Sequence, residues 1–348
     1  MTMKTYKVIF ALLLIANISN AQSVNLDRFP ISPTFRQLPK NPLGFDYKTY
    51  SVRTELGKFI STMYDKEIIA NKINLGGFNY TEENPDLNLH FTCEDIAILK
   101  TEIKNRVEEN KDKNGNVTSR NTLYWFELEY TLLAKYNLID NKKGGITLVK
   151  ADLDTRNNKY VYKSEETSSY KSAKEAYELN KENVVKNIVN AKFDNYIEAI
   201  NNYLTHNYGY PEITTYDILW IVGSKKHPEY AQYNEVAKKI AEAIKKMNGS
   251  EPVDTIKEEL KPSIEYLKGL PEKYTSNDKL GRKMRYSAYF NLATIYFYLD
   301  ELDEVVKYAN LIISNDYDTN DGKIFNNKVE ELKKLFEKNN INTRHFER

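Results

Sequence analysis

The residues of this sequence best suited to chemistry are its four histidines and its single cysteine. The histidines are His90, His206, His227 and His345; none occurs in an HExxH pattern, and none lies three or four residues from another. Structural and catalytic zinc sites usually draw on such closely spaced ligands. His90 and Cys93 are three residues apart on a predicted strand, so we expect their side chains to point to opposite faces. The spacing therefore argues against a zinc site.

The chain also lacks the common nucleophile and phosphate motifs. It contains no GxSxG elbow and no GxxxxGK[ST] or GxGxxG loop. Cys93 continues the alternating series Leu87, Leu89 and Phe91, which indicates a small buried side chain and not a reactive thiolate. Acidic pairs such as Glu258–Glu259 fall among lysines on predicted solvated helix faces. We expect no catalytic residue and no cofactor, and an unrecognised hydrolase remains an alternative.

The stretch SNDYDTNDGK, residues 314–323, comes nearest to a metal site because it resembles a calcium loop. With Asp316 at position 1, Asp318 and Asn320 occupy positions 3 and 5. The glycine then falls at position 7, and Asn327 occupies position 12. An EF-hand requires glycine at position 6 and a bidentate glutamate at position 12. We therefore interpret the stretch as a polar turn before a helix and predict no metal.

The first residues predict export. Lys4 and Lys7 precede the apolar run 8–18, and small residues at 19–21 end it, as in a secretory signal peptide cut before Gln22. The run is shorter than a membrane span, and no later stretch has 18 uncharged apolar residues. No cysteine follows the cleavage position for a lipid anchor. The expected location is the periplasm, with the outer surface or secretion left open.

Composition narrows the classes of partner. Lysine and arginine number 50 against 49 aspartates and glutamates, a balance that offers no electrostatic footprint for nucleic acid. Charged residues at 28% and hydrophobic residues at 41% are typical of a globular protein. The 27 tyrosines suit sheet and helix packing, and also protein interfaces or sugar-binding platforms. A protein or a glycan is thus the expected class of partner.

The pattern of apolar residues predicts an α+β fold in two domains after the signal peptide (1–21). Residues 22–47 hold four prolines and are expected to form an extended lead-in. Residues 48–225 are expected to form an α+β domain, in which an antiparallel β-meander is covered by helices. Alternating residues predict strands at 87–93, 124–138, 146–153 and 159–164, with an Asn-Gly hairpin at 111–119. A long helix, or two with a joint near Asn180, follows from Ser168 to Gly209.

From 226 to 348 the period is helical throughout, and residues 284–316 predict two antiparallel helices. Here the sequence resembles the tetratricopeptide repeat (TPR) family. The positions that match its pattern are Leu292, Ala293 and Tyr296 in the first helix, Asp300 and Leu302 at the turn, and Val305, Ala309 and Ile312 in the second helix. Ala293 replaces the usual glycine, Val305 the usual alanine, and no proline ends the repeat.

The resemblance implies a right-handed stack of helix pairs whose concave face binds peptides or proteins. Because three or more repeats are normally needed for stability, we expect this short array to lean on the α+β domain. The first domain is also topologically similar to the small α+β domains of Gram-negative envelope lipoproteins. We therefore expect a non-enzymatic scaffold that engages an envelope protein through Tyr289, Tyr298 and Tyr308, with a glycan-binding accessory protein as the alternative.

Overall fold

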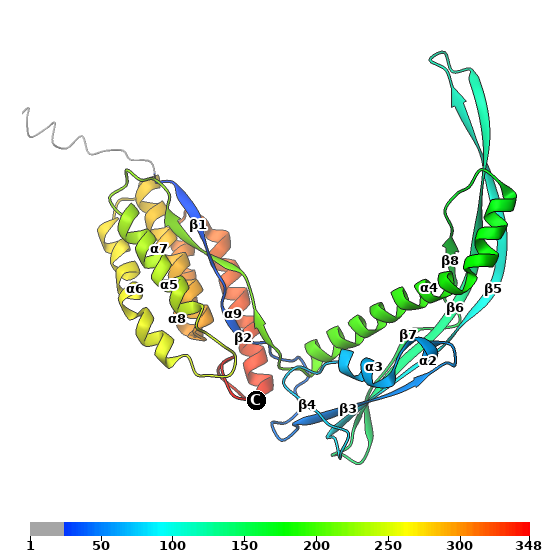
Figure 1. Cartoon of the computed structure of the whole chain (residues 1–348). Helices are drawn as coiled ribbons and strands as arrows, with labels where there is room; N and C mark the ends of the chain where they lie inside the picture. Colours follow the sequence, from blue (N-terminus) through cyan, green and yellow to red (C-terminus); the bar gives the residue numbers. More distant parts are fainter. Residues whose placement is uncertain (1–23) are drawn as a thin grey trace, which may run out of the picture. The chain divides into compact units, whose positions relative to one another are not determined.

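The computed structural model describes residues 24–348, so the predicted signal peptide lies outside the described residues. Two compact units divide the described chain (Figure 1). The helical unit comprises residues 24–38 and 212–347, and the sheet unit comprises residues 39–211 together with Arg348. This division differs from the expected boundaries, because residues 24–38 and 212–225 belong with the helices. The α+β class is confirmed, with eight helices among the described residues.

The sheet unit is built on a mixed sheet and not on the expected antiparallel meander. Its strand order is β4 (Asn79–Tyr80), β3 (Thr49–Leu56), β5 (Leu87–Lys111), β6 (Val117–Asp140) and β7 (Ile146–Asp154), and β8 (Tyr160–Lys163) also pairs with β6. Strands β5 to β8 pair antiparallel, whereas β3 runs parallel to both β4 and β5. The parallel pairs arise because the short helices α2 (Ile60–Met63) and α3 (Lys66–Lys72) carry the chain back between β3 and β4.

Strands β5 and β6 form a long hairpin around the predicted Asn-Gly turn. Gly115 has φ +86°, and the carboxylate of Asp112 accepts hydrogen bonds from the backbone N–H groups of Asn114 and Asn116 at 2.8 and 2.9 Å. Residues 105–121 are exposed on both faces, and the hairpin projects beyond the N-terminal end of the long helix α4 (Figure 1). The charged residues on both sides of this turn therefore continue the two strands as a solvent-exposed hairpin.

The long helix predicted after Ser168 is a single helix, α4 (Tyr170–Asn207), capped by the Ser169 hydroxyl. Its buried stripe lies against the sheet face made by the even residues of β6. One cluster at this contact contains Phe126, Leu128, Tyr130, Leu132, Val184 and Ile188. Burial of alternate strand residues under a helical stripe confirms the period-2 and period-3.6 patterns of the sequence.

The helical unit begins with residues of the expected extended lead-in. Strand β1 (Leu26–Ile31) pairs antiparallel with β10 (Asp217–Val222), and β2 (Thr34–Arg36) pairs with β9 (Glu212–Thr214). The prolines of this segment favour a linker in the sequence. Pro30 nevertheless lies in a two-stranded ribbon, where a missing N–H is tolerated. Residues 26–31 and 34–36 of the expected extended lead-in (22–47) are therefore extended, as paired strands of the helical unit.

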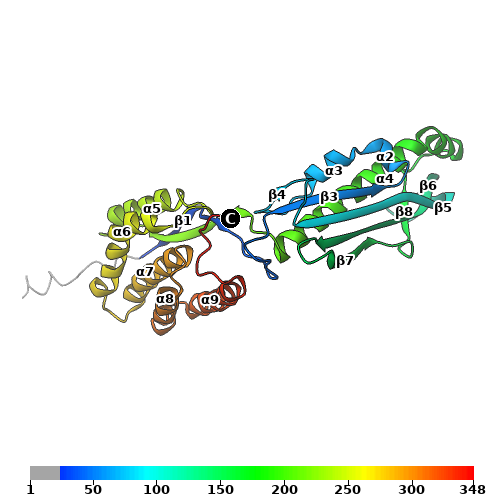
Figure 2. The ribbon, with the colours of Figure 1, turned by 90° about the horizontal axis from the view of Figure 1, so that it is seen from below.

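Five helices complete this unit: α5 (Tyr230–Ile244), α6 (Asp254–Lys273), α7 (Lys279–Tyr298), α8 (Leu302–Ser314) and α9 (Thr319–Asn339). Each helix contacts the next along the chain, and α5 and α7 also contact β10 (Figure 2). The stretch predicted as a polar turn, after Ser314, joins α8 to α9, with Asp318 as the N-cap. Pro262 lies inside the continuous helix α6.

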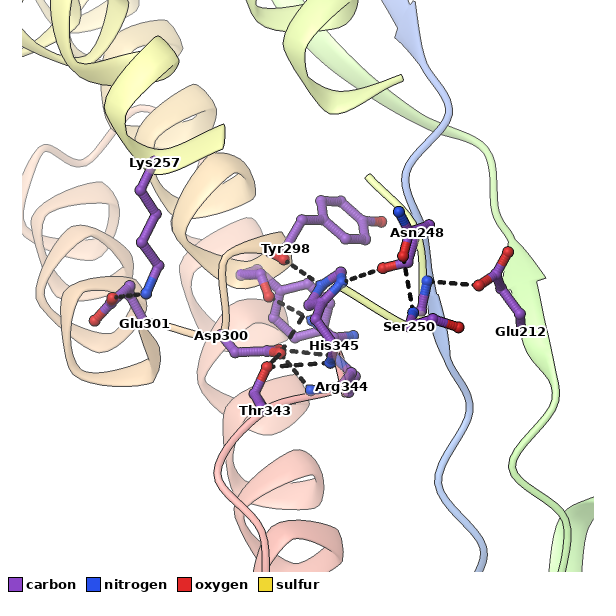
Figure 3. Close-up of polar contacts among 12 residues, drawn as sticks. Glu212, Asn248, Ser250, Lys257, Tyr298, Asp300, Glu301, Thr343, Arg344 and His345 are labelled. Atoms are coloured by element: carbon purple, nitrogen blue, oxygen red, sulfur yellow. Dashed lines mark hydrogen bonds and ion pairs between the residues drawn. The ribbon is translucent and has the colours of Figure 1, made fainter. Parts of the chain in front are cut away.

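A buried ion pair anchors the C-terminal tail to the turn between α7 and α8 (Figure 3). The Asp300 carboxylate accepts hydrogen bonds from Arg344 Nε at 2.7 Å, from its backbone N–H at 2.6 Å and from the Thr343 hydroxyl at 3.0 Å. The guanidinium also donates to the carbonyl of Phe297 and lies 4.3 Å from the ring centroid of Phe35 on β2. Only 5% of the Arg344 side chain and 3% of that of Asp300 are exposed.

The residue after Arg344 ties the tail to a further segment. His345 Nδ1 lies 2.7 Å from the carbonyl oxygen of Asn248, and Nε2 lies 3.2 Å from that of Tyr298 (Figure 3). Phe346 donates its backbone N–H to the carbonyl of Gly249, 3.0 Å away. The tail therefore joins the α5–α6 loop, the end of α7 and strand β2, which are far apart in the sequence.

We predict that Arg344→Ala lowers the free energy of unfolding of the helical unit by about 3–5 kcal/mol, because it leaves the Asp300 carboxylate buried without its partner. Urea unfolding followed by Trp220 fluorescence in a Trp125→Phe background measures this unit alone. Lys333→Ala is the matched control, since it breaks the Asp303–Lys333 pair, in which 95% and 51% of the side chains are exposed. Equal midpoints for the two variants would contradict the prediction.

Candidate functional site

The three tyrosines expected to bind a partner lie in different environments. Tyr298 is buried, with 5% exposed, and its hydroxyl donates to Asp217 on β10 at 2.7 Å. Tyr308 is buried to the same extent, and its ring stacks on that of Tyr296 at 5.7 Å between centroids. Tyr289 is half-buried. Tyr298 is buried because β10 covers the face of α7 that carries it, whereas Tyr296 is half-buried.

The chain's own ribbon occupies the face of the array made by α5 and α7. The Asn291 side chain on α7 forms two hydrogen bonds with the backbone of Trp220. It accepts one from the N–H and donates one to the carbonyl, both at 2.7 Å. The same amide donates to the Tyr233 hydroxyl on α5, and this hydroxyl donates to Ser287. This buried network fixes β10 against both helices, so an incoming chain has no access to this face in the structure.

A pocket of about 590 Å³ opens on the other side of α7. Tyr289 precedes Asn291 by two residues and Arg282 precedes it by nine, which places both about 180–200° around the helix from the ribbon. The α6–α7 loop, the end of α8 and the α8–α9 loop complete the walls. The lining residues are Pro271, Thr275, Asn277, Arg282, Arg285, Tyr289, Leu311, Ser314, Asn315 and Asp316. We refer to it as the Arg282 pocket.

Arg285 holds the walls of the Arg282 pocket in place. Its guanidinium donates to the carbonyl oxygens of Tyr274 and Ser276 at 2.5 and 2.7 Å and to the side-chain oxygens of Asn277 and Asn315 at 3.3 and 2.9 Å. These four acceptors come from the α6–α7 loop and the α8–α9 loop. Because these acceptors already engage its donors, Arg285 offers a ligand few free hydrogen-bond donors. Its contribution to the pocket is its positive charge and the rigidity that it gives the walls.

Arg282 is the group with donors to spare. Its one ion pair within residues 24–348 joins a terminal nitrogen to Asp316 at 3.4 Å, and 80% of the Asp316 side chain is exposed, so this pair is weak. Its Nε is shielded from solvent and has no hydrogen-bond partner among the described residues. Two guanidinium groups against one carboxylate leave the pocket with a net positive charge. A planar carboxylate suits such a fork because it can accept two parallel hydrogen bonds.

A second polar cluster, which sequence reasoning missed, surrounds Glu229 at the start of α5. The carboxylate is buried and accepts hydrogen bonds from Tyr266 at 2.7 Å, from Tyr274 at 3.2 Å and from Lys273. Burial opposes its ionisation, but the hydrogen bonds from Lys273 and Tyr266 outweigh burial and lower the pKa. The His227 ring stacks on Tyr274 and accepts the backbone N–H of Glu229 at 3.1 Å. This cluster fastens α5 to the end of α6.

The remaining candidates from the sequence lie apart. Cys93 is buried, and burial raises the pKa of its thiol to about 12, which confirms a core thiol. His90 is on the opposite strand face, as expected, 3.2 Å from Glu55. His206 lies in the last turn of α4, where Nδ1 is 2.7 Å from the carbonyl oxygen of Asn202. No group of three potential metal ligands occurs among residues 24–348.

Comparisons with known proteins supply no family. No family model matches the chain, and no curated protein matches it. Within the described residues, no helix has the length and apolar character needed to cross a membrane.

We predict that the helical unit loses stability below about pH 6.5 through His227. Burial lowers the pKa of His227 from its ordinary 6.5, with Glu229 opposing and Lys273 adding to this shift. The neutral ring therefore stabilises the fold above the unfolded pKa, and this contribution is lost as the pH falls through the folded pKa. The lowered pKa of Glu229 adds a further loss below its ordinary 4.5.

Thermal unfolding between pH 7.5 and 5, followed by Trp220 fluorescence, measures this dependence. The control is His227→Asn, whose amide oxygen can accept the same backbone N–H without titrating. We expect its melting temperature to fall less over this range than that of the parent. Parallel pH profiles for both proteins would exclude His227 as the source.

Proposed function

We propose that this chain is an exported, non-enzymatic binding protein whose TPR-like helical array holds a protein partner in the cell envelope. The Arg282 pocket is where a carboxylate-bearing segment of that partner enters. The observation that carries this proposal is Arg282 itself, a guanidinium that lines an open, positively charged pocket and whose solvent-shielded Nε has no hydrogen-bond partner among the described residues.

The rest of the lining suits recognition of a peptide. Tyr289 offers a half-buried ring, which gives contact area at a low cost in conformational entropy. Asn277 and Thr275 lie on the same loop and add amide and hydroxyl groups that can bond to a peptide backbone. The walls are held by the four hydrogen bonds of Arg285, so little ordering is needed on binding.

The TPR-like part of the proposal is supported by the helix pair α7–α8. Leu292, Ala293, Val305, Ala309 and Ile312, which match the packing positions of the repeat, are all buried. Each of the five helices packs against the next one along the chain, as in a stack of helical hairpins. Such arrays present rigid surfaces for protein partners, and here the α5–α7 face is already filled by β10.

The proposal predicts that Arg282→Gln weakens binding of an acidic peptide about tenfold, which is about 1.4 kcal/mol. The probe is a fluorescein-labelled tetraglutamate peptide, and its tetraglutamine counterpart tests the need for carboxylates. Asp316→Asn should strengthen binding, because it removes the carboxylate that competes for Arg282. Fluorescence anisotropy at two salt concentrations gives the affinities.

Arg120→Gln is the matched control, since Arg120 is an exposed arginine of the sheet unit that pairs with Glu109. We expect it to bind tetraglutamate as the parent does. Equal affinity for tetraglutamate and tetraglutamine, or no loss in Arg282→Gln, would disprove a carboxylate site at this pocket.

A further inference from the structure

An open strand edge in the sheet unit forms a second groove, separate from the Arg282 pocket. Strand β3 has β5 on one side along its whole length. On the other side β4 pairs only with Thr49 and Tyr50. Beyond Tyr50, no strand among residues 24–348 lies on that side of β3. Figure 2 shows the short β4 near one end of β3 and helix α3 alongside.

The main-chain groups of this edge point outward. The carbonyls of Lys48 and Tyr50 accept hydrogen bonds from the backbone of Asn79 and Thr81, which identifies the residues that face β4. Because a strand alternates with period 2, the N–H and C=O groups of Val52 and Thr54 point to the same side. They therefore offer donors and acceptors for one more strand.

A groove of about 350 Å³ runs along these groups. Its strand wall is residues 51–55 of β3, and its opposite wall is Lys66, Glu67 and Ala70 of α3. Tyr80 and Glu82 line it as well, and the exposed ring of Tyr80 packs edge-on against Tyr50. A groove between a strand edge and a helix is the geometry in which an extended peptide adds to a sheet.

Other strand edges of the chain carry features that oppose such pairing. Trp220 on β10 has its outward backbone groups bound by Asn291. Beyond Cys93, β5 contains register shifts between Glu94 and Ala97 and between Ile98 and Lys100. Bulges and covered backbone groups are common protection against unwanted strand addition. The register of β3 with β5 runs from Tyr50 to Leu56 without a shift, so this edge lacks that protection.

The charges of the groove favour a basic segment. Arg53 and Glu55, 3.7 Å apart, carry opposite charges that cancel in the net charge of the groove. The remaining charges are Glu67 and Glu82 against Lys66, a net charge of −1. Thr54 Oγ is buried without a hydrogen-bond partner among the described residues, and Val52 and Ala70 lie beside it on the groove walls. A strand with one small apolar residue here and a lysine or arginine near Glu67 would complement these groups.

We propose that the β3–α3 groove binds an extended polypeptide segment that carries a basic residue and pairs with β3 as an additional strand. This surface is independent of the Arg282 pocket, so the chain holds two protein segments at once. The backbone of Val52 and Thr54 provides the pairing, and Glu67 provides the preference for positive charge.

The test uses the chain without its first 21 residues and a labelled, capped hexapeptide of alternating threonine and valine with one central lysine. We expect binding to fall about tenfold when alternate peptide nitrogens are methylated, because methylation removes the pairing N–H groups and keeps the side chains. Val52→Pro should have the same effect. Proline is tolerated on an edge strand where its nitrogen faces outward, so this variant is expected to fold.

Glu67→Lys tests the charge preference without touching the backbone. It should weaken binding of the lysine peptide and strengthen binding of a matched glutamate peptide, whereas Glu178→Lys on the exposed face of α4 should change neither. Arg282→Gln should also leave this peptide's affinity unchanged, which separates the groove from the Arg282 pocket.

Two results would overturn the proposal. Equal binding of the methylated and unmethylated peptides would show that no strand is added. A dimer in sedimentation experiments that Val52→Pro dissociates would assign the edge to a second copy of this chain.

Discussion

The helical unit depends on one buried charge pair. Asp300 occupies a turn with φ +59°, and its carboxylate draws the backbone and guanidinium of Arg344 into a site closed by aromatic rings. Removing two charges from water is costly, and additional hydrogen bonds must offset the cost. Two further hydrogen bonds help to offset this cost: Arg344 donates to the carbonyl of Phe297, and the Thr343 hydroxyl donates to Asp300. The pair therefore specifies where the last residues of the chain lie more than it adds net stability.

Local periodicity was enough to predict β6 and α4. The alternation from Tyr124 to Leu138 matched β6, and the apolar stripe from Ala173 to Leu204 matched α4. These patterns are visible because each element buries one face. The Asn-Gly hairpin was also predictable, since positive φ at Gly115 is a local requirement.

Contacts between distant segments were not predictable from one sequence. The pairing of β1 with β10 joins Leu26 to Val222, and the sequence around Leu26 contains no signal for that partner. Proline content there favoured a linker, but a two-stranded ribbon accepts Pro30. The Glu229 cluster could not be predicted for the same reason, because its partners come from the C-terminal half of α6. Tyr289 could be predicted as a candidate because the pattern of its helix is local. Arg282 could not, because its pocket is completed by the α6–α7 and α8–α9 loops.

The two candidate binding surfaces use different physics. The Arg282 pocket offers a guanidinium to a side-chain or terminal carboxylate, so its selectivity is electrostatic and weakens with salt. The β3–α3 groove offers backbone groups, so its selectivity comes from chain extension, with charge as a secondary preference. Opposite net charges at the two surfaces would direct different segments to each.

The order of segments in the helical unit has a consequence for how the protein is made. Its first strands precede the entire sheet unit, and their partners, β9 and β10, follow it. As the ribosome produces the chain from its N-terminus, residues 39–211 of the sheet unit are complete while β1 still lacks a partner. Long separations of this kind slow folding, since the intervening loop must close first. The helical unit can therefore fold fully only after residues 39–211 have been made, and β1 must wait for β10 across that whole stretch.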